Sequence, residues 1–412
     1  MLMGQSAHFK VRRKEMKITG LRYMLCKGTL NYDGPLGEER LVRPVDIYPE
    51  FRAEPATWPA RKGDKESSYP LEAVFLFIDT DAAISGTWGP ISIQLARTIE
   101  GLKRILIGED PHAVERIWDK MYRYAIHGRK GETMMAISAI DLALWDFKGK
   151  DLGVPVYKLL GGPSRDKIRA YASMLGYSIE PESAFRRASE VVAQGYTATK
   201  WFFRHDPTEG REGMRKNLEL IRTIREAVGP DVDIMFDAWS SWDVPYTIGM
   251  AELAAEYRPW WFEEPVMPDL IPQHAEIRRA VRTIAIAGGE HEYTRWGVKA
   301  LLDAGAVDIL QTDVTWAGGL TEMLKICALA SAYAIPVIPH HGAAASTQLI
   351  ASQTITACPI QEYLLQHGLV GQYFLETKIV PVNGAIELPK APGMGMELDD
   401  SVIESRQELC LS

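Results

Sequence analysis

The chain has 412 residues, 46% of them hydrophobic and 24% charged, a composition typical of folded globular proteins and unlike that of disordered or membrane chains. This length indicates two or three domains of roughly 150 residues, although one α/β barrel alone can take about 200 to 250. The formal charge of -8 gives no basic field for a nucleic-acid backbone, so we expect no nucleic-acid partner.

The cysteines and the apolar segments indicate a reducing, aqueous compartment. The four cysteines form no CxxC pair, so we expect neither a disulfide framework nor a structural zinc site, and the cytoplasm fits best. Residues 1–20 are basic but lack the apolar run of a secretory signal, and no apolar stretch reaches the roughly 18 residues of a membrane span. We therefore expect no membrane partner, and we interpret residues 1–15 as an extension ahead of the folded chain.

From residue 16 to about 90 the sequence predicts short β segments on either side of a long polar stretch. The β segments are KITGLRYML at 17–25 and EAVFLFIDT at 72–80. The stretch from 31 to 70 is rich in Pro, Arg and Glu and exceeds the usual loop length, as functional lids and binding loops commonly do. We take it as a candidate lid.

From about 91 to 150 the pattern is helical. Ile137, Ile140, Leu144 and Phe147 recur at three- and four-residue steps, which places them on one face of a helix. Gly149 and the LGVP that follows it predict the end of that helix. Residues 16–160 are therefore expected to form an α+β domain.

After LLGG at 159–162 short apolar runs alternate with amphipathic helices, the pattern of repeated βα units and a parallel sheet. The runs are IRAYAS, ATKWFF, VDIMFD, WWFEE, TIAIAGGE, AVDILQTD, IPVIPHH and IQEYLL. Eight runs predict a closed (β/α) barrel over residues 161–370, with its active site at the C-terminal ends of the strands. The Pro- and Gly-rich tail, 371–412, is expected to return to the N-terminal domain.

Six consecutive runs carry an ionisable residue at or near their C-terminal ends. These residues are Lys200, Asp237, Glu263, Glu290, Asp313 and His340. The steps between them, obtained by subtraction, are 37, 26, 27, 23 and 27 residues, so after the first step they recur about once per βα unit. In a barrel this periodicity places all six side chains around one mouth.

Three of these residues, Asp237, Glu263 and Glu290, are carboxylates on adjacent predicted strands. Converging hard oxygen ligands suit Mg²⁺, and without a cation the three charges would repel one another. A single strand-end acid is about as often a helix cap or an ion-pair partner. Capping does not require acids on successive strands, so the set predicts a magnesium site.

Asp313 and His340 follow on the next two strands, a spacing at which a carboxylate can orient an imidazole and raise its basicity. His341 is adjacent, and only one of the two histidines can point into the mouth of the barrel if the backbone is extended there. We favour His340, which directly follows Pro339.

Two further residues are candidates for contact with a substrate. Lys200 can neutralise a carboxylate or a developing enolate oxygen, or its long side chain can reach the surface instead. Glu362, in PIQEYLL, follows His340 by 22 residues and can either contact the same substrate or form a buried salt bridge.

These residues stand in motifs that resemble the mandelate racemase subgroup of the enolase superfamily over about residues 16–400. The motifs are AISAIDLALWDFKGKDLGVPVYKLLGG, FDAW, FEEP, GGEHEYT, TDVTWAGGLTE and IPHHG. The resemblance implies a (β/α) barrel, a modified TIM barrel, with an α+β capping domain that the C-terminal tail completes. It also implies Mg²⁺ bound by Asp237, Glu263 and Glu290, an acid/base pair of His340 and Asp313, and Glu362 near the substrate carboxylate.

One departure from the subgroup narrows the activity that the resemblance implies. Racemases of the subgroup carry Lys-x-Lys at the second strand, with the second lysine as a base, whereas this chain has Lys200-Trp201-Phe202. Phenylalanine cannot transfer a proton, so a reaction that needs one histidine is favoured over racemisation. In this respect, and in KWFFR and GGEHEYTRWG, the chain is most similar to L-rhamnonate dehydratases and related sugar-acid dehydratases.

The activity implied is the dehydration of an aldonate to a 2-keto-3-deoxy acid. The alternatives are another enolate reaction, by an epimerase, a cycloisomerase or an aldarate dehydratase, and a non-catalytic barrel that binds sugar acids. Polyols need many hydrogen bonds, for which the candidates are Arg43, Tyr48, Arg52 and Arg61, and the segment 122–129 with His127. Barrels with a capping domain commonly assemble symmetrically, so we expect a homo-oligomer.

Overall fold

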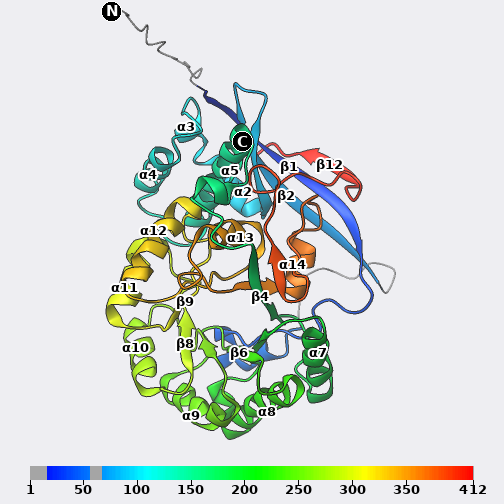
Figure 1. The fold of residues 1–412 in the computed structure, drawn as a ribbon, viewed down its shortest axis with the longest axis vertical. Helices are drawn as coiled ribbons and strands as arrows, with labels where there is room; N and C mark the ends of the chain where they lie inside the picture. The colour runs from blue at the N-terminus through cyan, green and yellow to red at the C-terminus, as the bar shows by residue number, and fades with distance from the viewer. Residues whose placement is uncertain (1–15, 56–66, 412) are drawn as a thin grey trace, which may run out of the picture.

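The computed structural model describes residues 16–55 and 67–411. A four-stranded sheet with helices forms one end of the molecule, and a barrel of parallel strands surrounded by helices forms the other (Figure 1). Arg61 and the extension 1–15 lie outside the described residues. Within the described ranges, none of the helices combines the length and the apolar character needed to cross a membrane.

The antiparallel sheet has the strand order β12-β1-β2-β3. Its strands are β1 (Ile18–Asn31), β2 (Ser68–Thr80), β3 (Ser85–Ile91) and β12 (Ser405–Glu408). Both predicted β segments are strands, β1 and β2, but the prediction that they are short is wrong. They pair out to Asn31 and Ser68, which shortens the predicted loop. That loop also contains a 3-10 turn, η1 (Pro44–Ile47), and a short helix, α1 (Pro49–Arg52).

Five helices follow β3 in the chain and complete what we call the N-terminal part. They are α2 (Ile93–Glu100), α3 (Lys103–Leu106), α4 (Val114–Tyr124), α5 (Glu132–Leu152) and α6 (Val156–Leu159). The predicted helix is α5, and it ends at Leu152, within the predicted LGVP, where Gly153 with a φ of 67° forms the left-handed C-cap. Gly149 itself does not end the helix. Gly149 is instead a site of close approach, since a Cβ there would lie 2.5 Å from Gly393 Cα.

Gly149→Ala is expected to lower the free energy of unfolding by about 1 to 3 kcal/mol, because backbone atoms of Gly393 would have to move. Gly249→Ala is the matched control: it lies in α9 (Val244–Ala254) and a Cβ there would meet only Met214 Cε, at 3.5 Å. That change should stabilise the protein by about 0.5 to 1 kcal/mol. Urea unfolding of both variants measures the difference, and equal effects would contradict this account.

Asp141 of α5 is a buried carboxyl at the junction with α12 (Gly319–Ala332), where it accepts a hydrogen bond from the backbone N–H of Thr321. Burial raises the pKa of Asp141 to about 7, against the hydrogen bonds from Thr321 and the charge of Lys325. A folded-state pKa above the unfolded value means that stability present below about pH 4 is lost as the pH rises towards 7.

Compared with Asp141→Asn, which cannot titrate, the wild type should therefore lose on the order of 2 to 4 kcal/mol of stability between about pH 4 and 7. Thermal midpoints of both proteins across this pH range provide the measurement. A difference between them that does not change with pH would contradict the raised pKa.

The barrel contains seven hydrogen-bonded parallel strands in the order β10-β4-β5-β6-β7-β8-β9. They are β4 (Lys167–Ser173), β5 (Ala198–Phe202), β6 (Asp233–Asp237), β7 (Trp261–Glu263), β8 (Ala285–Gly288), β9 (Ile309–Leu310) and β10 (Gln361–Leu364). The short β11 (Ala385–Glu387) pairs antiparallel with β4. Seven of the eight predicted runs are thus strands of one sheet.

The eighth predicted run, IPVIPHH at 335–341, is not a regular strand, so that prediction is wrong in detail. Pro336 and Pro339 have no N–H for a ladder, and only Val337 forms a bridge, to Leu310. The run still occupies the eighth place, because the N–H groups of Ile338 and His340 donate to β9 and to the residue after it.

A helix follows each barrel strand and the segment at 335–341. These helices are α7 (Pro181–Ala193), α8 (Gly210–Val228), α9, α10 (Ile271–Ala280), α11 (Thr294–Ala304), α12, α13 (Ala343–Ser352) and α14 (Leu365–Gly371). Helices α7 to α11 surround the outside of the barrel (Figure 1).

The inside of the barrel is filled by a layer with one residue from each of the eight places. The layer consists of Tyr171, Ala198, Met235, Trp261, Ala287, Ile309, Ile338 and Ile360. Alternate side chains of a strand point to the same face, so the residue two positions further along each strand is expected to point into the mouth above this layer.

Candidate active site

The residues two positions beyond the interior layer are polar at seven of the eight places. They are Ser173, Lys200, Asp237, Glu263, Gln311, His340 and Glu362. The exception is Gly289, whose φ of 101° bends the backbone, and the next residue is Glu290. The β-strand period therefore accounts for four of the six residues predicted at strand ends and for Glu362, and the bend at Gly289 accounts for Glu290.

The three predicted metal ligands lie together. One carboxylate oxygen each of Asp237, Glu263 and Glu290 lies within 4.8 Å of the other two, and the three side chains are almost fully buried. Burial, together with the charge of Glu263, raises the pKa of Asp237 well above its usual value, and burial raises that of Glu290 to about 8. Glu290 Oε2 has no hydrogen-bond partner among the described residues.

These observations are those of a site that fits a divalent cation. Three buried carboxylates that crowd one another are unfavourable without positive charge between them. Oxygen donors on rigid strands are what Mg²⁺ prefers, and three such ligands would leave three of its six positions for water or substrate.

Lys200 lies inside the site, not at the surface, with 1% of its side chain exposed. Its ammonium lies 2.5 Å from Glu263, 2.9 Å from Glu362 and 3.6 Å from Asp237. Burial alone would lower the pKa of Lys200, but these carboxylates raise it well above its usual value. The same ion pair lowers the pKa of Glu362 to about 2 against the effect of its burial. Glu362 thus forms a buried salt bridge within the site.

His340 pairs with Asp313. The distance from His340 Nδ1 to Asp313 Oδ2 is 2.8 Å, and His340 Nε2 lies 3.7 Å from Glu290 Oε2. Thr315 donates two hydrogen bonds to the other oxygen of Asp313, from its N–H and its hydroxyl. Burial alone would lower the pKa of His340, but Glu290 and Asp313 raise it to about 10.

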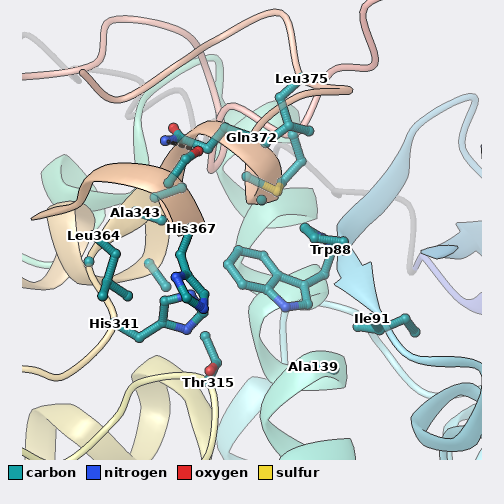
Figure 2. Close-up of a pocket in the computed structure, with 18 of the residues that line it drawn as sticks. Trp88, Ile91, Ala139, Thr315, His341, Ala343, Leu364, His367, Gln372 and Leu375 are labelled. Carbon is teal, nitrogen blue, oxygen red and sulfur yellow. Dashed lines mark hydrogen bonds between the residues drawn. The ribbon is translucent and has the colours of Figure 1, made fainter. Parts of the chain in front are cut away.

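His341 lies farther from the Asp313 carboxylate than His340 does. Its φ is 55°, its Nδ1 is 3.9 Å from Asp313, and its ring lines a cavity of about 230 Å³ together with Trp88 and His367 (Figure 2). The cavity lies between the N-terminal part and the barrel, and most of its lining is apolar. The positive φ turns the backbone between the two histidines, and this geometry separates His340 from His341.

Several residues that contact the site were not singled out from the sequence. Glu263 Oε2 accepts hydrogen bonds from Gln311 and Trp261. Trp261 lies two residues before Glu263 itself, and Gln311 lies two residues before Asp313. Each donor is therefore an even number of positions from a predicted residue on the same run. Glu264 lies 2.6 Å from His291 Nδ1. These two residues are the second Glu of FEEP and the His of GGEH, so each directly follows a predicted ligand.

The described candidates for specificity are placed differently from one another. Arg43 forms ion pairs with the buried Asp46 and with Glu54, and Arg52 lies 3.6 Å from Asp206. These two arginines therefore hold the segment of η1 and α1 in place. Tyr48 is 54% exposed, and His127 is exposed as well, so contact of either with a ligand stays a prediction.

Known proteins resemble the chain over nearly its full length. Residues 68–161 match the mandelate racemase / muconate lactonizing enzyme N-terminal domain, and residues 184–402 match the enolase C-terminal domain-like model. An L-rhamnonate dehydratase of Saccharopolyspora erythraea is 39% identical over 379 residues, covering 89% of this chain and 91% of that protein. A putative L-rhamnonate dehydratase of Caldivirga maquilingensis is 35% identical, covering 88% of each chain.

Solved structures agree with these sequence matches. The rhamnonate dehydratase of Gibberella zeae complexed with Mg has a TM-score of 0.78 and 30% identity, with 94% of this chain and 95% of that chain covered. The 3,6-anhydro-D-galactonate cycloisomerase of Zobellia galactanivorans has a TM-score of 0.74 and 29% identity, with 94% and 100% covered. The chain therefore belongs to the mandelate racemase / muconate lactonizing enzyme family, in the mandelate racemase subgroup of the enolase superfamily.

Proposed function

We propose that this protein is a Mg²⁺-dependent dehydratase that converts an aldonate similar to L-rhamnonate into a 2-keto-3-deoxy acid. The observation that carries the proposal is the pairing of one imidazole with one carboxylate, His340 with Asp313, beside the three-carboxylate cluster. Phe202 stands where racemases of the subgroup have a second basic residue. Relatives that match along most of the chain are named L-rhamnonate dehydratases, which supports this choice of reaction.

The first step is removal of the proton from C2 of the substrate by Nε2 of His340. In its neutral form His340 donates Nδ1–H to Asp313, which leaves Nε2 free to accept the proton. A cation held by Glu290 would offset the carboxylate charge that raises the pKa of His340. Asp313 also stabilises the imidazolium that forms, as the carboxylate of a His–Asp pair does in other enzymes. Thr315 holds Asp313 in the required orientation.

Proton removal leaves an enediolate, with negative charge on the former carboxylate group. Lys200 is fixed by ion pairs with Glu263 and Glu362, so its ammonium can offset this charge without reorganisation. Asp237, Glu263 and Glu290 would hold Mg²⁺, which when bound supplies further positive charge to the substrate oxygens.

In the second step the C3–O bond breaks, and the imidazolium of His340 donates its proton to the departing hydroxyl, which leaves as water. The electron pair of the enediolate forms the C2–C3 double bond of an enol. Tautomerisation moves the proton of the enol hydroxyl to C3 and gives the 2-keto-3-deoxy acid. The overall change is the loss of one water, and His340 returns to its neutral form.

The test is incubation of the protein with Mg²⁺ and a panel of aldonates and aldarates, with colorimetric detection of 2-keto-3-deoxy acids. A chelator and the His340→Asn variant are the controls. Product from one or two aldonates that requires both the metal and His340 supports the proposal. Product from aldarates alone would reassign the substrate, and no product would favour another enolate reaction or a non-catalytic role.

A further inference from the structure

Helix α5 carries the first motif of the family resemblance, and several of its buried residues are polar. Three of them bind the start of α12. Ser138 Oγ accepts a hydrogen bond from the N–H of Gly318 at 2.8 Å, and Asp141 Oδ2 accepts one from the N–H of Thr321 at 3.0 Å. Trp145 Nε1 donates to the hydroxyl of Thr321 at 2.9 Å.

These bonds supply the N-terminal cap of α12 from another part of the molecule. The N-cap residue, Gly318, has no side chain, and the first N–H groups of a helix otherwise lack acceptors. Gly319 has a φ of 74°, and a Cβ there would collide with the Asp141 carboxylate. Trp118 of α4 completes the contact by donating to the carbonyl of Gly318.

The start of α12 is directly connected to the Asp313–His340 pair. The N–H groups of Trp316 and Ala317 both donate to the carbonyl of Asp313, so the chain from Asp313 to Gly318 is a tight turn. The ring of Trp316 lies 4.9 Å from that of His340, between centroids. A displacement of Gly318 would therefore move both the partner of the imidazole and the ring packed against it.

On its other side this turn borders the cavity. Thr315 and Trp316 line it, and Met135 and Ala139 of α5 line it as well; Figure 2 shows Thr315 and Ala139 beside the open space. Side chains next to a void lack packing partners on that side. The hydrogen bonds from α5 are therefore a main constraint on where the turn lies.

We propose that Ser138 and Asp141 are positioning residues for the Asp313–His340 pair, so that the N-terminal part of the protein sets the geometry of the catalytic base as well as adjoining the site. The catalytic half of this inference rests on the proposed function. The geometric half is that α5 fixes the relative position of the His340 imidazole and the Asp313 carboxylate. It does not depend on which reaction the protein performs.

The kinetic test compares Asp141→Ala and Ser138→Ala with Asp146→Asn. Asp146 is the matched control because it is also buried in α5 but accepts from the N–H groups of Thr87 and Met394, away from α12. The first two variants should lower kcat by about 10- to 100-fold with KM within about 2-fold, because a misplacement of about 1 Å can cost about 100-fold. Asp146→Asn should lower the thermal midpoint and leave kcat unchanged, and Asp141→Asn, which keeps an acceptor oxygen, should retain activity.

The second test needs no turnover. The proton of the His340–Asp313 hydrogen bond should give a downfield imidazole N–H signal in the proton NMR spectrum, assigned by its loss in His340→Asn. We expect this signal in the wild type, Asp146→Asn and Asp141→Asn, and a shifted or broadened signal in Asp141→Ala and Ser138→Ala. These results would support the positioning role even if no substrate were dehydrated.

An unchanged signal and unchanged kcat in Asp141→Ala and Ser138→Ala, with only a lower thermal midpoint, would overturn the proposal. If Asp141→Ala does not fold, Ser138→Ala decides by the same two readouts, since it removes one hydroxyl and keeps the carboxylate of Asp141.

Discussion

Replacing His340 with asparagine is expected to lower kcat for dehydration by about 1,000-fold or more while Mg²⁺ binding is retained. In the proposed mechanism the imidazole takes the C2 proton and returns it to the leaving hydroxyl, and a positioned acid/base group contributes roughly 100- to 10,000-fold. Asparagine keeps a hydrogen-bonding side chain near Asp313 but cannot transfer protons. Steady-state kinetics measure kcat, and titration calorimetry with Mg²⁺ measures binding.

His341→Asn is the matched control for this experiment. Its ring points into the apolar cavity, and its closest approach to the Asp313 carboxylate is 3.9 Å, against 2.8 Å for His340. The variant should therefore retain kcat within about 10-fold. Full activity in His340→Asn, or inactivity confined to His341→Asn, would show that His340 is not the base.

Glu290→Gln is expected to abolish both the activity and the thermal stabilisation by Mg²⁺ without lowering the thermal midpoint of the metal-free protein. A buried carboxylate that is held near two others opposes folding when no cation is present, as the pKa of about 8 for Glu290 indicates. The neutral amide relieves that repulsion and removes one of the proposed metal ligands. The thermal midpoint without Mg²⁺ measures the relief of repulsion, which favours folding. The change in midpoint on adding Mg²⁺ measures the loss of metal binding, which removes stabilisation.

Glu292→Gln is a suitable control for the metal site. Glu292 is also buried, but it forms an ion pair with Lys130 at 2.5 Å and is not a member of the three-carboxylate cluster. The variant should keep the stabilisation by Mg²⁺ that Glu290→Gln loses. A lower thermal midpoint of metal-free Glu290→Gln would contradict this account. It would mean that the Glu290 carboxylate stabilises the protein more through His340 and His291 than it destabilises it by repulsion.

The barrel could be predicted from the sequence because a parallel sheet repeats one local pattern. Each apolar run with a charged residue at its end satisfies the same two-residue alternation, so Lys200, Asp237 and Glu263 follow directly from their place after the interior layer. The segment 335–341 also followed the pattern, but its two prolines leave only one bridge in the structure. Its place in the barrel was predictable, and its hydrogen bonding was not.

Other features depend on contacts between distant residues and could not be predicted. Gly149 looks like a helix terminator in the sequence, yet it is required inside α5 by the backbone of Gly393, which lies 244 positions later. The cap that Asp141 provides for α12 spans 180 positions. Neither local propensity nor periodicity contains information about such pairs.

The pairing of β12 with β1 has a consequence for the order in which the protein folds during synthesis. The barrel lies between these strands in the chain, and β1 pairs with Ser405–Glu408 only after the ribosome has made everything before them. Until then one edge of β1 is unpaired, and an open strand edge is a site for association with other chains. The nascent protein therefore has a complete set of barrel strands before β12 pairs with the open edge of β1. Chains that stop short of β12 are expected to aggregate through β1.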